Sequence, residues 1–212
     1  MGISKPRELN INTSKTAVKR LEIYAETLLP TQQGDFKCLV FRETGGLEHV
    51  ALIKGDVSAQ ANILCRIHSE CLTSEAFGSL KCDCKQQLDF ALEAIQKNGS
   101  GILLYLRQEG RGIGLGNKIK AYALQEAGLD TVDANEALGL PVDAREYELA
   151  AQMLKYLNIG SIQLLTNNPL KLEALLVAGI HVSRKKLDIP AVSEQAAEYV
   201  LVKQKRLGHF GT

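Results

Sequence analysis

Three of the five cysteines in this 212-residue chain lie close together in the sequence, and their spacing suggests a metal site. Cys82 and Cys84 stand two residues apart, so on an extended segment both thiols point to one face, and Cys71 supplies a third thiol slightly earlier. Zn²⁺ favours thiolate ligands in tetrahedral geometry, and catalytic zinc sites keep one position open for water, whereas structural sites usually have four protein ligands. Three thiols without a nearby fourth therefore predict a hydrolytic zinc, one per chain.

Other arrangements of these cysteines are less consistent with the surrounding sequence. Free cysteine often acts as a small buried hydrophobic residue, but charged residues flank and interrupt the pair at 82 and 84 and make apolar burial awkward. A disulfide between Cys82 and Cys84 would close a very tight ring. His68 is a possible fourth ligand, yet three residues before Cys71 on a strand it faces the opposite side.

A second candidate for chemistry is the glycine-rich segment 107–115, which reads Arg-Gln-Glu-Gly-Arg-Gly-Ile-Gly-Leu. Glycine lets backbone N–H groups approach a phosphate, and arginine offers a planar fork of donors. The spacing matches neither a Walker A loop nor a dinucleotide fingerprint, so a plain tight turn is an equal alternative. The segment follows an apolar run at 101–106, and open α/β sheets bind ligands at the carboxyl ends of their strands.

The hydropathy pattern that must position these residues divides the chain into two halves. Up to residue 67, short apolar or alternating runs separated by Gly45-Gly46 and Gly55-Asp56 predict antiparallel strands that lead to the first candidate thiol. From residue 86, helical periodicity alternates with apolar runs. We expect helices over 86–98, 119–128, 144–157, 170–177 and 190–206, and strands over 101–106, 162–166 and 180–182.

The predicted fold class is therefore mixed α/β, with an antiparallel, β-rich N-terminal half followed by an α/β half. Residues 1–19 are polar and without periodicity, and we expect a flexible arm there, followed by a single catalytic domain over 20–209. Cys38 and Cys65 lie within apolar runs and are expected in the core.

Composition excludes several classes of function. The net charge of +1 provides no basic field of the kind that drives nucleic-acid binding. No apolar run is long enough to span a membrane. An odd number of cysteines, three of them clustered, argues for a reducing cytoplasm rather than a disulfide framework. We therefore expect a cytoplasmic protein without nucleic-acid or membrane partners.

Several motifs together resemble the signatures of GTP cyclohydrolase II, the enzyme family that makes the first committed intermediate of riboflavin synthesis. They are Arg-Ile-His-Ser-Glu-Cys-Leu-Thr at 66–73, Leu-Lys-Cys-Asp-Cys at 80–84, the glycine-rich segment, Thr-Asn-Asn-Pro at 166–169 and, weakly, Gly208-His209. The resemblance implies that GTP is hydrolysed to 2,5-diamino-6-ribosylamino-4(3H)-pyrimidinone 5′-phosphate, formate and diphosphate. It also implies Mg²⁺ bound with the triphosphate and a homodimer, for which the Gly/Ala-rich C-terminal helix would be suited.

The resemblance implies catalytic roles for three side chains that also have ordinary explanations. Asp143 is a plausible helix N-cap, and Tyr122 fits the core face of an amphipathic helix. In similar enzymes, the position of Asp143 is a proton-accepting aspartate, and that of Arg145 is an arginine that engages the α-phosphate as diphosphate leaves. The position of Tyr122 lies near the ring that is opened.

The resemblance also implies a set of substrate contacts. From the residues alone, Gln87 is either a partner for the edge of a guanine base or a solvated helix start, and Arg66 and Glu70 are either substrate contacts or a salt bridge. Glu109 could also hold the Mg²⁺ of a triphosphate. The implied substrate-binding residues are Arg66, Ile67, His68, Ser69, Glu70, Gln87, Glu109, Gly110, Arg111, Thr131, Thr166 and Lys171.

The chain departs from the family pattern beside the candidate thiols. Ser74 and Glu75 stand where Gly-Asp is usual, and Lys85 stands where glycine is usual. Lys85 is either a solvated lysine or a cation that tunes the metal site. Two alternatives to the implied reaction therefore stay open, a divergent paralogue with an altered product and an inactive zinc-stabilised nucleotide-binding protein. The balanced charge disfavours a third alternative, a zinc-containing nucleic-acid module.

Overall fold

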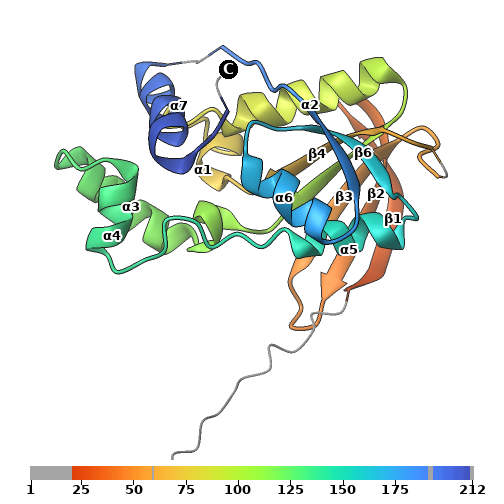
Figure 1. The fold of residues 1–212 in the computed structure, drawn as a ribbon, viewed down its shortest axis with the longest axis horizontal. Helices are drawn as coiled ribbons and strands as arrows, with labels where there is room; N and C mark the ends of the chain where they lie inside the picture. Colours follow the sequence, from red (N-terminus) through yellow and green to blue (C-terminus); the bar gives the residue numbers. More distant parts are fainter. Residues whose placement is uncertain (1–20, 59, 191–192, 211–212) are drawn as a thin grey trace, which may run out of the picture.

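A computed structural model describes residues 21–58, 60–190 and 193–210 of the chain (Figure 1). The arm expected at 1–19 lies outside the described residues. The strands are β1 (Leu21–Thr31), β2 (Gly34–Glu43), β3 (Glu48–Lys54), β4 (Ile63–Ser69), β5 (Gly101–Leu106), β6 (Ser161–Leu165) and β7 (His181–Lys185). The helices are α1 (Leu72–Glu75), α2 (Cys84–Asn98), the short 3₁₀-helix η1 (Glu109–Gly112), α3 (Leu115–Glu126), α4 (Thr131–Ala137), α5 (Glu148–Tyr156), α6 (Pro169–Val177) and α7 (Glu194–Leu207).

The strands form one mixed sheet in the order β1-β2-β3-β5-β4-β6-β7. The pairs β1–β2, β2–β3 and β3–β5 are antiparallel, and the pairs β4–β5, β4–β6 and β6–β7 are parallel. Gly45 and Gly46, both with positive φ, form the turn between β2 and β3, as the sequence predicts. The expected mixed α/β fold, antiparallel first and α/β afterwards, is confirmed.

The expected placement of β4 in the antiparallel half is wrong. The chain leaves β4, passes through α1 and α2, and returns as β5 beside β4, and such a crossover makes the two strands parallel. The strand residues themselves are predicted correctly, because the apolar run at 63–67 is a local signal. The strands that pair with β4 lie far away in the sequence, so the apolar run at 63–67 does not indicate whether the pairing is parallel or antiparallel.

Two helices begin later than expected, and one helix was not expected. Helix α5 begins at Glu148 rather than at 144, and α7 begins at Glu194 rather than at Pro190. Helix α4 was not expected, since its seven residues are too few to show a clear period. It begins where the side chain of Asp130 accepts hydrogen bonds from the N–H groups of Val132 and Asp133.

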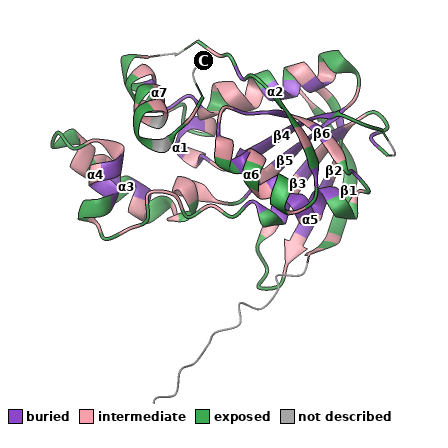
Figure 2. Cartoon of the chain, in the orientation of Figure 1, coloured by how far each residue is buried: buried purple, intermediate pink, exposed green. Residues whose placement is uncertain are grey.

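Many of the buried residues lie on the central strands of the sheet and on the helices that pack against it (Figure 2). They form two clusters, one on each face of the sheet. Successive residues of β5 alternate between them: Leu104 packs with α5 and α6, and Leu103 packs with α2. Covering on both faces explains why this strand is a continuous apolar run rather than an alternating one. No described helix is long and apolar enough to cross a membrane.

The parallel strands β4, β5 and β6 end at one edge of the sheet, and each is followed by a segment with predicted site residues. Cys71 comes shortly after β4, η1 follows β5, and Thr166 comes directly after β6. The carboxyl ends of parallel strands are the usual place for a ligand site in such sheets. The fold thus brings together motifs that are far apart in the sequence.

Candidate active site

The three predicted metal ligands converge at this edge. The sulfur atoms of Cys71, Cys82 and Cys84 all lie within 4.8 Å of one another, and the Sγ atoms of Cys71 and Cys82 are 3.6 Å apart. Two sulfurs that each lie about 2.3 Å from one tetrahedral Zn²⁺ are roughly 3.8 Å apart. The thiols therefore fit a single ion without a large rearrangement.

The way in which the pair reaches the site differs from expectation. Cys82 and Cys84 do not lie on a strand, because Cys82 lies in the irregular segment before α2 and Cys84 is the first residue of that helix. Cys71 is the residue just before α1. The thiols are therefore brought together by the segments that lead into α1 and α2, and not by one face of a strand. Among the described residues, His68 is not part of the cluster, as predicted.

Hydrogen bonds make one thiol of the cluster much more acidic than the others. Bonds from the thiols of Cys82 and Cys84, followed by the nearby ammonium of Lys118, hold the pKa of Cys71 well below its usual value. The pKa values of Cys82 and Cys84 are raised, chiefly by the hydrogen bond of each with Cys71. The surroundings thus favour one thiolate in the cluster, and a divalent cation would favour the other two.

The two cysteines outside the cluster behave differently. Cys65 is fully buried in the sheet, as expected for a core residue, and burial raises the pKa of its thiol to about 12. Cys38 is only half-buried, so the expectation that it lies in the core is wrong. Burial raises its pKa as well.

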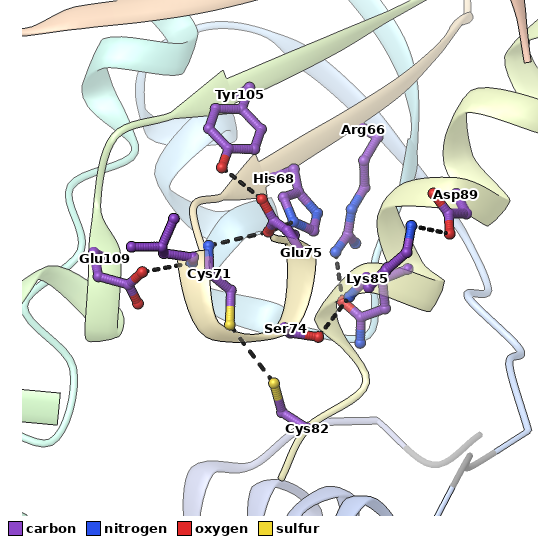
Figure 3. A network of polar contacts seen from close by, with 12 residues as sticks. Arg66, His68, Cys71, Ser74, Glu75, Cys82, Lys85, Asp89, Tyr105 and Glu109 are labelled. Carbon is purple, nitrogen blue, oxygen red and sulfur yellow. Dashed lines mark hydrogen bonds and ion pairs between the residues drawn. The ribbon is translucent and has the colours of Figure 1, made fainter. Parts of the chain in front are cut away.

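A half-buried carboxylate supports the segment that carries Cys71 (Figure 3). Glu75 accepts hydrogen bonds from the backbone N–H of Cys71 at 3.0 Å, from His68 Nε2 at 2.8 Å and from the hydroxyl of Tyr105 at 2.5 Å. Because the carboxylate only accepts, His68 must carry its proton on Nε2. The departure from the usual Gly-Asp at this place therefore gives a network that fixes the first thiol.

Ser74 and Lys85, the other two residues that depart from the family pattern, contact one another. The hydroxyl of Ser74 accepts a hydrogen bond from the backbone N–H of Lys85 at 3.1 Å, near the start of α2 (Figure 3). The ammonium of Lys85 lies 2.8 Å from the carboxylate of Asp89, one turn further along the same helix, and its side chain is 45% exposed. Of the two alternatives for Lys85, these contacts favour the solvated lysine.

Arg66 and Gln87 form one polar unit beside the thiols. Arg66 donates to the carbonyl of Leu165 at 2.9 Å and to Gln87 Oε1 at 2.6 Å, and the Gln87 amide donates to Asp83 Oδ2 at 2.6 Å. Burial lowers the pKa of Arg66 to about 10, so the guanidinium keeps its charge at neutral pH. Gln87 is therefore a half-buried, hydrogen-bonded residue that lines the cleft, and not a solvated helix start.

Arg66 and Glu70 do not form the salt bridge that was one of the two alternatives for this pair. Glu70 instead accepts from Arg107 Nε at 2.8 Å. Glu70 still faces the same cleft as Arg66.

The glycine-rich segment is a tight turn with an unusual backbone. Gly110 and Arg111 both adopt left-handed conformations, with φ of 61° and 59°. A side chain at Gly112 would lie 2.8 Å from the carbonyl oxygen of Ala144, so glycine is required for the close approach. The N–H of Ala144 donates to the carbonyl of Arg111 at 2.9 Å. The turn is thereby joined to the segment that carries Arg145.

The charged groups of this turn have protein partners. Glu109 accepts from the N–H of Leu72 at 2.6 Å and from Lys118 Nζ at 2.8 Å. Arg111 donates to the hydroxyl of Tyr199 in α7 at 3.0 Å. The turn therefore connects the first thiol segment to the C-terminal helix.

Asp143 and Arg145 form a close ion pair. Arg145 Nε donates to Asp143 Oδ1 at 2.8 Å, and Nη2 donates to Oδ2. Burial opposes the charge of Asp143, but hydrogen bonds and charge from Arg145 hold its pKa below the usual value. The alternative that Asp143 caps α5 is wrong, because that helix begins after Tyr147 and the Asp143 carboxylate is occupied by Arg145.

One cleft contains nearly all of the predicted site residues. The exceptions are Ile67, which is buried in the core, and Asp143, which lies beside a second cavity that it shares with Arg145. The predicted residues that line the cleft are Arg66, His68, Ser69, Glu70, Cys71, Cys82, Cys84, Gln87, Glu109, Gly110, Arg111, Tyr122, Thr131, Arg145, Thr166 and Lys171.

Comparison with known proteins identifies the family. The profile of the GTP cyclohydrolase II family matches residues 22–186. Over 190 residues the chain is 52% identical to GTP cyclohydrolase-2 of Neisseria meningitidis serogroup A, with 90% of this chain and 96% of that one covered. The chain belongs to the GTP cyclohydrolase II family.

Other relatives agree with this assignment. GTP cyclohydrolase-2 of Klebsiella pneumoniae is 50% identical over 192 residues, which cover 90% of this chain and 96% of that one. The riboflavin biosynthesis protein RibBA of Chlamydia trachomatis is 49% identical over 184 residues, or 86% of this chain and 43% of that protein. The chain is therefore an enzyme, a hydrolase of the GTP cyclohydrolase II family.

Two further groups of residues that line the cleft were not predicted from the sequence. Lys118 lies one helical turn before Tyr122, so the shared face of α3 was a signal that could have found it. Tyr199 and Phe210 enter the cleft from the C-terminal region. No local pattern marks them, because only the path of the chain after β7 brings them there.

The buried His68 predicts how stability depends on pH. Burial lowers its pKa from 6.5 to about 4, although the hydrogen bond to Glu75 favours the charged form, and Arg66 and Lys171 add to the lowering. Between pH 6.5 and 4 the unfolded chain binds the proton and the folded chain does not, so stability falls as the pH falls, by on the order of 3 kcal/mol at most.

We expect His68→Gln to remove this slope, because the glutamine amide can still donate to Glu75 but does not titrate. Urea unfolding of the wild type and of His68→Gln at several pH values between 7 and 4 measures how the free energy of unfolding depends on pH. Parallel losses of stability in wild type and variant would contradict the assignment of the slope to His68.

Proposed function

We propose that this hydrolase converts GTP to 2,5-diamino-6-ribosylamino-4(3H)-pyrimidinone 5′-phosphate, formate and diphosphate, the first step of riboflavin biosynthesis. The observation that carries the proposal is the joint presence in one cleft of the three-thiol cluster and of Arg145 and Lys171. The cluster suits hydrolysis at one end of the nucleotide, and the cations suit phosphate groups at the other. The family relationship to proteins named GTP cyclohydrolase-2 supports the same reaction.

Cys71, Cys82 and Cys84 would hold one Zn²⁺. Their sulfur atoms have the separation that tetrahedral thiolate coordination requires, and the set lacks a fourth thiol. When bound, Zn²⁺ supplies Lewis acidity for hydrolysis at C8 of the guanine ring. The two waters consumed there open the imidazole ring and release C8 as formate.

Arg145 and Asp143 would act at the α-phosphate. Arg145 is charged, because its hydrogen bonds with Asp143 raise its pKa even though burial lowers it. In the proposed reaction the arginine engages the α-phosphate, and a water molecule attacks the α-phosphorus. The proton of that water passes to Asp143 as the bond to diphosphate breaks and diphosphate leaves. The ion pair holds both groups in place before substrate arrives, but Asp143 becomes free to accept a proton only when Arg145 turns towards phosphate.

Other cleft residues would bind the nucleotide. Gln87 would meet the guanine edge, and Lys171 would approach the triphosphate. Lys171 is buried, and its ammonium donates to the carbonyl of Ile67 at 2.8 Å. Tyr122 would lie beside the ring that opens. The remaining proposed substrate contacts are Arg66, His68, Ser69, Glu70, Glu109, Gly110, Arg111, Thr131 and Thr166, with Ile67 contributing only main-chain atoms.

Mg²⁺ would bind with the triphosphate, as its preference for phosphate oxygens suggests. Glu109 is a poor candidate for its ligand, because the carboxylate already accepts from Leu72 and Lys118. We further infer a homodimer formed by single catalytic domains over 20–209, in the cytoplasm, where free thiols stay reduced. Light scattering that gives a mass near 23.1 kDa would reject the dimer.

A turnover experiment tests the proposed function. Purified protein with GTP and Mg²⁺ is expected to release formate and diphosphate in equal amounts and to contain one zinc per chain. Cys82→Ser should lose the zinc, whereas Cys38→Ser, which alters a half-buried thiol outside the cluster, should keep it. Binding of GTP without release of either product would support the inactive nucleotide-binding alternative, and a different product would support the divergent paralogue.

We also expect the two halves of the reaction to separate by mutation. The α-phosphate and C8 are different reaction centres and need not share residues. Cys82→Ser should abolish formate release yet leave some diphosphate release. Arg145→Ala should strongly suppress diphosphate release, and Asp143→Asn should slow turnover without loss of zinc.

Separate assays of formate and diphosphate measure this split. The division fails if a folded Cys82→Ser protein that still binds GTP releases no diphosphate. In that case the metal would serve both steps or would hold the whole site together.

A further inference from the structure

Lys118 places a buried positive charge against the thiol cluster. Its side chain comes from α3 and is only 10% exposed. The ammonium donates to Cys71 Sγ at 3.1 Å and to Glu109 Oε1 at 2.8 Å. It also lies 5.8 Å from the centre of the Tyr122 ring. The nitrogen therefore has fixed partners on two sides and is not a mobile surface charge.

The helix and the glycine-rich turn together fix this position. Lys118, Ala121 and Tyr122 share the face of α3 that lines the cleft, whereas Lys120 points to solvent. Gly110 packs on the stem of the lysine, since a side chain there would lie 3.1 Å from Lys118 Cβ. The stem is thus held between the helix and the turn, and the ammonium has little freedom to leave the sulfur.

The chemistry of the proposed centre requires such a charge. Three thiolates and one Zn²⁺ leave one excess negative charge, which is costly to bury without a counter-charge. A hydrogen bond from an ammonium is among the strongest that a thiolate can accept. Lys85, the cation suggested by the sequence, is bound to Asp89 instead.

We propose that Lys118 is a positioning residue of the three-thiol centre, which offsets its excess negative charge, orients Cys71 and joins the centre to the glycine-rich turn through Glu109. This inference rests on the proposed zinc site. The rival explanation is that Lys118 only neutralises the buried carboxylate of Glu109 and that its approach to Cys71 is incidental. The two explanations differ in what happens when Glu109 is neutralised as well.

The test compares zinc binding in four single variants. Lys118→Met removes charge and donor, Lys118→Gln keeps a donor without charge, and Lys118→Arg keeps both. Lys120→Met is the matched control on the exposed face of the same helix. Competition with a chromophoric chelator should show zinc dissociation constants raised about 10-fold or more by Met and Gln, as for other residues that support metal ligands. Arginine and the control should stay close to wild type.

A spectroscopic readout separates this role from a purely structural one. In cobalt-substituted protein, loss of the ammonium should raise the energy of the sulfur lone pairs. The sulfur-to-cobalt charge-transfer band of Lys118→Met and Lys118→Gln should therefore shift to longer wavelength. Lys120→Met should leave the band unchanged.

A double variant decides against the rival explanation. If Lys118 serves only Glu109, then Lys118→Gln combined with Glu109→Gln should recover wild-type zinc affinity, and recovery overturns the inference. The inference is also overturned if Lys118→Gln keeps the wild-type zinc affinity and an unshifted charge-transfer band, and this result counts even if Lys118→Met does not fold.

The inference and the proposed zinc site fail in different ways. If the wild-type protein binds no zinc, both are overturned. If the wild-type protein binds zinc and the Lys118 variants bind it equally well, only the inference about Lys118 is overturned.

Discussion

The convergence of three thiols in a poorly solvated place is the constraint on which the rest of the site depends. Ionised thiolates within 4.8 Å of one another repel strongly where water cannot screen them. Side chains of the protein itself offset part of this repulsion and hold the thiols in place. The ammonium of Lys118 contacts Cys71, and Glu75 holds the backbone at that cysteine. The groups around the thiols are therefore as much a part of the centre as the sulfurs.

The sheet explains how so many distant residues reach this place. Parallel strands β4, β5 and β6 end together, and their following segments supply a thiol, the glycine-rich turn and Thr166. Contacts between loops complete the arrangement, as where Ala144 meets Gly112 without room for a side chain. The ion pair with Asp143 then sets the direction of the Arg145 side chain.

Local patterns predicted well what depends on local chemistry. The hairpin at Gly45-Gly46, the apolar run of β5 and the three thiols all follow from adjacent or nearly adjacent residues. Resemblance to a family added the residues that line the cleft. Contacts between side chains that are distant in the sequence could not be predicted in the same way. The sequence does not show that Lys118 contacts Cys71 or that Tyr199 contacts Arg111, and only the contact of Lys85 with Asp89 favours one of the two alternatives for that lysine.

X-ray absorption at the zinc edge of the purified protein tests the account most directly, because it counts the sulfur ligands of the bound metal. We predict three sulfurs at about 2.3 Å and one oxygen or nitrogen ligand at about 2.0 Å. That result would match the three thiols of the cluster together with an open position for hydrolysis. Four sulfur ligands, or a zinc bound mainly by oxygen and nitrogen, would contradict the account.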